Sequence, residues 1–62
     1  ADGEKLAEVA GVALGYHRND LDFERYALEA ALLIAAGADL TRLGEWIAEG
    51  ERRRSIGQLS AR

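Results

Sequence analysis

The chain has 62 residues and no cysteine, so it forms at most one small domain without disulfides or thiolate chemistry. Its net charge of −3 argues against nucleic-acid binding by the body of the chain, and a single histidine excludes a site built from several imidazoles. A core this small rarely contributes more than about 3–5 kcal/mol. We therefore expect help from close helix packing or, as we favour, from pairing with a second copy.

The sequence contains no segment that predicts a membrane span or a secretory signal peptide. The longest apolar run, 30–36, has seven residues, whereas a membrane span needs roughly 20. No basic segment is followed by an apolar one, as it is in a signal peptide. We expect a cytoplasmic protein, and the excess of arginine over lysine favours a GC-rich genome, bacterial or phage.

The absence of proline and of strand-like runs predicts an all-α fold. The expected architecture is a small three-helix unit or a helical hairpin, completing its core by homodimerisation. The first helix is predicted at about 4–16, with Asp2 as a plausible N-cap. Its inner face is expected to hold four residues at helical spacing: Leu6, Val9, Ala13 and Tyr16. Gly11 and Gly15 indicate either a close approach of another helix or an early end of this one.

The second helix is predicted at 20–36, capped by Asn19 or Asp20 and closed by Gly37 in a left-handed conformation. One apolar stripe consists of Phe23, Ala27, Ala30 and Ile34. Further apolar residues widen it: Leu28, Ala31, Leu32 and Ala35. A helix apolar over so much of its circumference needs two packing partners. The other two helices are one possibility, and a second copy is the other.

The third helix is predicted at 40–54, starting from a cap at Asp39 or Thr41. Its expected inner face consists of Leu40, Leu43, Trp46, Ile47 and Gly50. We expect 1–54 to form the single helical domain and 55–62 to be a flexible basic tail.

Two segments resemble parts of bacterial helix-turn-helix proteins. In 6–12, Ala7 and Gly11 match the small residue and the turn glycine, but His17 then stands where the motif needs an aliphatic residue. In a second frame, 33–37 supplies the helix end and turn, and Leu43 the following aliphatic position. Only Arg42 is then available to contact bases or phosphates. An ordinary amphipathic helix and an αα-hairpin with a glycine turn are the plainer interpretations.

Charge is unevenly distributed along the chain. Residues 1–51 contain eleven acidic and four basic side chains, whereas 52–62 contain four arginines and no acid. Arg52, Arg53 and Arg54 either bind phosphates or an acidic surface, or simply end a helix beside Glu49 and Glu51. The predicted partner-binding residues are Tyr16, Phe23, Leu43, Trp46, Ile47, Arg52, Arg53 and Arg54, because aromatic side chains and arginine dominate binding energy.

The pattern of polar residues favours neither a metal site nor catalysis. The acids from Asp20 to Glu24 lack the sixth-position glycine and twelfth-position glutamate of a calcium loop. Ser55 and Ser60 have no second histidine to form a triad, and no glycine-rich phosphate loop is present. We expect no enzyme activity, no cofactor and no small-molecule substrate.

These observations favour a protein–protein interaction module: a regulator, adaptor, inhibitor or accessory subunit whose partner is another protein, itself, or both. The alternative is a small dimeric helix-turn-helix-like regulator that binds DNA. A third possibility is an accessory subunit of a larger enzyme.

Overall fold

Three α-helices make up the part of the chain that the structure describes. The computed structural model describes the backbone of residues 2–60 and the side chains as far as Gly57. Helix α1 spans Asp2–Tyr16, α2 spans Phe23–Ala35 and α3 spans Leu40–Ser60. Within the described residues, all regular structure is helical. The all-α prediction is therefore confirmed, in its three-helix form.

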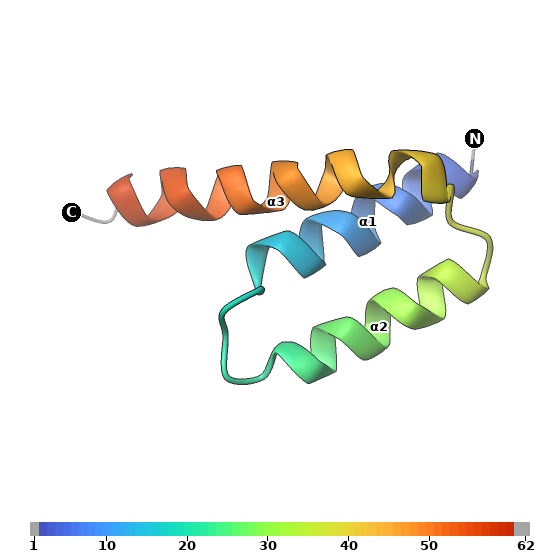
Figure 1. Cartoon of the computed structure of the whole chain (residues 1–62), viewed down its shortest axis with the longest axis horizontal. Helices are drawn as coiled ribbons and strands as arrows, with labels where there is room; N and C mark the ends of the chain where they lie inside the picture. The colour runs from blue at the N-terminus through green and yellow to red at the C-terminus, as the bar shows by residue number, and fades with distance from the viewer. Residues whose placement is uncertain (1, 61–62) are drawn as a thin grey trace.

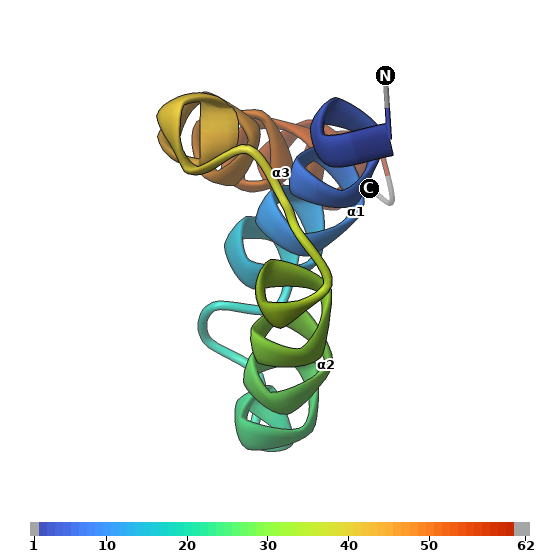
Figure 2. The same cartoon turned by 90° about the vertical axis from the view of Figure 1, so that its right-hand side faces the viewer.

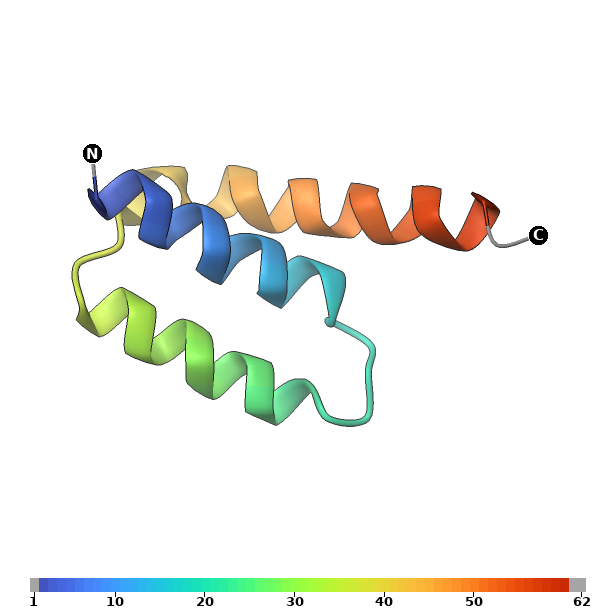
Figure 3. The same cartoon turned by 180° about the vertical axis from the view of Figure 1, so that it is seen from behind.

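Helix α1 lies between the other two helices, which do not pack along each other. Viewed end-on, α3, α1 and α2 form an open L with α1 at the corner (Figure 2). The view from behind shows the same order (Figure 3). The radius of gyration is 11.7 Å, compared with about 10.6 Å for a compact domain of this length.

A hydrogen-bonded cap ends α2 as the sequence predicts. Gly37 has a positive φ of 115°. The Gly37 amide donates to the Ile34 carbonyl at 3.0 Å, and the Ala38 amide donates to the Leu33 carbonyl at 3.3 Å. These two bonds define a Schellman motif, in which glycine is favoured because a Cβ is penalised at positive φ.

The three predicted N-caps have different outcomes. Asp2 does not precede α1 as a cap, because it is the first residue of the helix itself. Asp39 caps α3, because its Oδ1 accepts from the Thr41 amide at 3.0 Å and from the Thr41 hydroxyl at 2.6 Å. The prediction for α2 is wrong. That helix begins at Phe23, and the preceding residue, Asp22, makes no capping bond. Asp20 instead binds side chains of other segments.

Helix α3 is longer than the sequence predicts. We expected a flexible tail from Ser55, but 55–60 continue the helix. Arginine and glutamate pairs at three- and four-residue spacing support α3 just before this point. Arg62, also assigned to the tail, lies outside the described residues.

The buried face of α1 is not the one expected. Val9 is 50% exposed and Tyr16 36% exposed. The buried residues are the small ones: Ala7, Ala10, Gly11 and Gly15. Side chains this small let two helix backbones approach, so packing selects the side of α1 that carries least bulk.

The core contains only small residues. Its buried hydrophobic residues are Ala7, Ala10, Ala30 and Ala38, and no large side chain among residues 2–57 is fully buried. The accessible surface is 4391 Å², whereas a compact monomer of 6.7 kDa exposes about 3,900 Å². The chain therefore exposes about 500 Å² more than a compact monomer of its mass.

Candidate functional site

Helices α1 and α3 meet backbone to backbone at three glycines. A Cβ on Gly15 would lie 2.9 Å from the Glu51 nitrogen and closer still to the Ile47 carbonyl oxygen. A Cβ on Gly50 would lie 2.8 Å from the Tyr16 nitrogen and would also overlap the Val12 carbonyl. Gly11 is similarly enclosed by residues 43–47 of α3. This contact therefore tolerates no side chain at these glycines.

Three of the predicted partner-binding residues lie at this internal contact. Leu43, Trp46 and Ile47 are half-buried on α3, and backbone or Cβ atoms of all three surround Gly11. The Arg42 guanidinium lies over the Trp46 ring, 6.0 Å from its centroid. These apolar residues therefore pack within the chain, although part of each remains accessible.

Phe23, another predicted partner-binding residue, is half-buried at the start of α2. It lies on the same side of the helix as the fully buried Ala30. Its stripe, predicted from spacing, is the one that packs toward α1.

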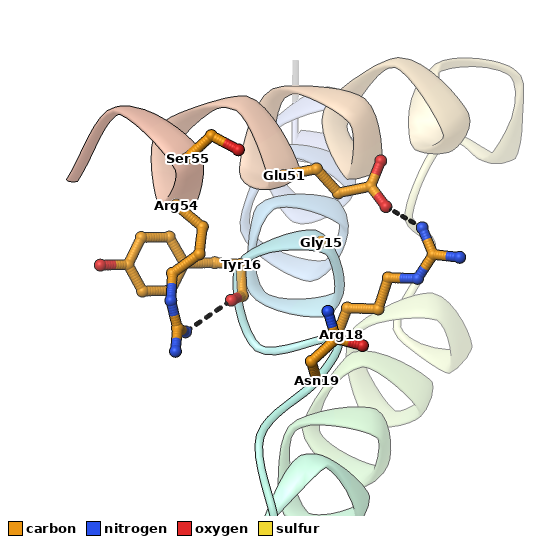
Figure 4. A pocket seen from close by; sticks show the side chains of 7 residues that line it. All are labelled: Gly15, Tyr16, Arg18, Asn19, Glu51, Arg54 and Ser55. Carbon is orange, nitrogen blue, oxygen red and sulfur yellow. Dashed lines mark hydrogen bonds and ion pairs between the residues drawn. The ribbon is translucent and has the colours of Figure 1, made fainter. Parts of the chain in front are cut away.

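Arg54 connects α3 to the end of α1 and to the following turn. Its Nη1 donates to the Tyr16 carbonyl oxygen at 2.8 Å, and its Nη2 donates to Asp20 Oδ1 at 2.9 Å. Its guanidinium carbon lies 5.1 Å from the centroid of the Tyr16 ring. Arg54 and Tyr16 do come together, as Figure 4 shows, but they join segments of one chain.

His17 completes this cluster from the turn after α1. Its Nδ1 lies 2.7 Å from Asp20 Oδ2, and its ring stacks on Tyr26 with centroids 3.6 Å apart. Asp20 thus contacts both His17, three residues before it, and Arg54, thirty-four residues after it. The hydrogen bond from Arg54 has the largest effect on the pKa of the Asp20 carboxyl, and the bond with His17 the second largest. Together they hold that pKa below its usual value.

A shallow pocket of about 310 Å³ opens beside this cluster. It is lined by Gly15, Tyr16, Arg18, Asn19, Glu51, Arg54 and Ser55. Arg18 pairs with Glu51 across its mouth (Figure 4), and Arg54 pairs with Asp20. Because both cations have carboxylate partners, the pocket does not concentrate unpaired positive charge on a ligand.

The remaining two predicted arginines share one carboxylate on α3. Arg52 Nε donates to Glu49 at 3.0 Å, and Arg53 Nε donates to it at 2.7 Å. These hydrogen bonds lower the pKa of Glu49 to about 2. The arginine run therefore divides: Arg52 and Arg53 pair along α3, and Arg54 reaches across to Asp20.

We expect acid to destabilise the fold through Asp20 and Glu49. Both carboxyls have lowered pKa values in the folded chain, and that of Glu49 is about 2 instead of 4.5. Their stabilisation is therefore present above the unfolded pKa and is lost as pH falls through the folded one. The melting temperature should be steady from neutral pH to about 5 and should fall between about 4.5 and 2. Thermal melts followed by circular dichroism measure this.

Glu49→Gln serves as the comparison in the acid series. It should melt lower than the parent at neutral pH and lose less on acidification, because one titrating carboxyl is gone. A parent melting temperature that holds constant or rises between pH 5 and pH 2 would contradict the linkage.

An uncovered apolar surface follows α2 and the turn before it. We call Leu21, Leu28, Leu32 and Ala35 the outer stripe. Leu21 is fully exposed, and Leu28 and Leu32 are 63% and 64% exposed. Leu28 and Leu32 each lie two residues from buried Ala30, about 200° around the helix. The partner-binding prediction omitted these residues, although the wide apolar circumference of α2 was the signal for them.

The first helix-turn-helix frame is contradicted. Gly11 lies inside α1, and α1 is continuous from Asp2 to Tyr16, so 6–12 contains no turn. In the second frame, a turn at Gly37 does separate two helices, but α2 and α3 do not pack along each other.

In the described part of the chain, none of the three helices combines the length and the apolar composition needed to cross a membrane. No group of three or more histidine or acidic side chains is placed to hold a metal ion among these residues.

Comparison with protein-family models, with curated proteins and with solved structures finds no match for this chain.

Proposed function

We propose that the chain is a non-enzymatic protein-interaction module, acting as a regulator, adaptor, inhibitor or accessory subunit. Its exposed leucines are covered by a second copy of the chain or by another protein. One observation carries the proposal: none of the large side chains that the structure describes is fully buried, while Leu21, Leu28 and Leu32 are largely exposed. Fully burying one leucine contributes about 1.5–3 kcal/mol. Covering the outer stripe therefore offers a gain comparable to the whole stability of a small core.

The shape of the molecule supports the same proposal. Three helices in an open L leave the side of α2 that faces away from α1 without a neighbour. Soluble monomers rarely expose contiguous apolar patches beyond a few hundred Å² unless those patches bind something. Leu28 and Leu32, 63% and 64% exposed, lie on that side of α2.

The pairing of the arginines favours a protein partner over DNA. Contact with a phosphate backbone relies on free lysine and arginine side chains. Arg18, Arg52 and Arg54 each have a carboxylate partner on the chain. Binding to DNA would have to replace those pairs against a net charge of −3.

Sedimentation equilibrium of the purified chain at micromolar concentration tests self-association. We expect a mass above the 6.7 kDa of the monomer. The same sample should pass through heparin at moderate salt, whereas a DNA-binding regulator would be retained. A monomer that unfolds cooperatively would overturn self-association, and retention on heparin would favour the DNA-binding alternative.

A further inference from the structure

The outer stripe points to a specific arrangement of two copies. We infer that α2 of one copy packs antiparallel against α2 of another, about a two-fold axis at Leu28. This inference rests on the proposed function and names the surface and geometry of the contact.

The stripe is nearly symmetric about Leu28, which makes it self-complementary. Leu21, in the turn just before α2, precedes Leu28 by seven residues, and Ala35, the last residue of α2, follows it by seven. In an antiparallel pair centred on Leu28, each Leu28 contacts its copy, and the turn that carries Leu21 lies near Ala35 of the other copy. Two-fold contacts use the same patch on both copies, so a patch that matches its own reverse is suited to one.

Charge selects the antiparallel orientation. A parallel pair in register would bring Arg25 against Arg25, Glu24 against Glu24 and Glu29 against Glu29. In the antiparallel pair, Arg25 of one copy lies about 3 Å along the axis from Glu29 of the other, at 1.5 Å per residue. The Arg25 side chain is 68% exposed and lies 3.7 Å from Asp22. It also lies over the Tyr26 ring, 5.7 Å from its centroid. Exposed contacts of this kind contribute only about 0–1 kcal/mol, so the side chain can turn toward that glutamate.

The same arrangement partly buries Leu32 against the second copy. Antiparallel pairing places it opposite Glu24 and Arg25 of the second copy. The aliphatic stem of an arginine packs on apolar surface while its charged head stays in water. Arg25 thus covers Leu32 and reaches Glu29 of the same neighbouring copy.

The length of the outer stripe fits a weak, reversible dimer. Its part on α2, from Leu28 to Ala35, is about 10 Å long at 1.5 Å per residue, and Leu21 extends it into the preceding turn. A standard interface buries roughly 800 Å² per partner, and a stripe this short predicts a smaller contact.

Charge inserted into the stripe tests its role. Leu28→Glu should weaken self-association at least tenfold in sedimentation equilibrium, because it places two carboxylates together on the axis. Its helix content should be unchanged, since Leu28 is 63% exposed and glutamate is a good helix former. Val9→Glu is the matched control: Val9 is exposed on α1, beside Arg53 of α3. This control should associate like the parent.

Cross-linking tests the orientation, and the absence of native cysteine makes single-cysteine variants unambiguous. A short bis-maleimide reagent should link a mixture of Leu21→Cys and Ala35→Cys, and should link Leu28→Cys to itself. It should leave Leu21→Cys alone as monomers, because antiparallel pairing places the two copies of that residue at opposite ends of the contact.

The outcomes separate the two proposals. If the parent associates but Leu28→Glu associates equally well, the outer stripe is not the contact, and the proposed function stands. Linkage of Leu21→Cys to itself, without linkage to Ala35→Cys, would overturn the antiparallel orientation. A parent that remains monomeric overturns both self-association and this interface.

Discussion

Gly15→Ala should destabilise the chain more than any other single methyl group added to it. The new Cβ would lie 2.9 Å from the Glu51 nitrogen and nearer still to the Ile47 carbonyl oxygen, both fixed atoms of the α3 backbone. Overpacking of this kind costs about 1–3 kcal/mol, and no side-chain rotation relieves it. The gain in helix propensity, up to about 1 kcal/mol, opposes the loss only in part. We expect a net loss near 2 kcal/mol, measured by thermal or denaturant unfolding at fixed protein concentration.

Gly44→Ala is the matched control for this substitution. Gly44 lies in α3, and a Cβ there would meet nothing within 4 Å. The variant should be more stable than the parent by about 0.5–1 kcal/mol, because alanine is the better helix former. If Gly15→Ala and Gly44→Ala stabilise the chain equally, α1 and α3 do not approach as closely as described.

Trp46→Ala should cost about 2 kcal/mol, roughly half of the 3–5 kcal/mol typical when a fully buried aromatic side chain is truncated. Trp46 is half-buried at the α1–α3 contact, with its Cβ against Gly11 and its ring beneath Arg42. Because it is the only tryptophan, its variant is compared with the parent by circular dichroism.

Val9→Ala provides the comparison for the tryptophan variant. Val9 is exposed on α1, and surface substitutions of this kind usually change stability by less than about 0.5 kcal/mol. A Trp46→Ala chain as stable as Val9→Ala would mean that Trp46 contributes nothing to the fold. Trp46 would then be available to a partner, as the sequence alone suggested.

The sequence predicts helix caps correctly where the cap depends only on neighbouring residues. Gly37 after an apolar helix and Asp39 two residues before Thr41 each predict a cap, and both caps are present. Such motifs depend on neighbouring backbone groups alone. Asp20 shows where such predictions fail. Its residue type and position suit a cap, but its carboxylate instead binds Arg54, thirty-four residues away.

The buried face of α1 was missed because hydrophobic periodicity ranks residues by bulk. Leu6, Val9 and Tyr16 form the larger apolar stripe, yet two of them are exposed. The contact instead uses Gly11 and Gly15, because they have no Cβ to keep the α3 backbone away. Side-chain size likewise favours Trp46 over Leu28 and Leu32 as a predicted partner residue. Only the position of α3 shows which apolar residues the fold leaves uncovered.

The most direct test of the central claim is the dependence of the melting temperature on protein concentration. The claim is that this chain covers little of its own apolar surface and completes its core with a second copy. Folding coupled to association is stabilised by mass action. The melting temperature should therefore rise steadily over about a hundredfold increase in concentration. A cooperative transition at one temperature throughout that range would contradict the claim.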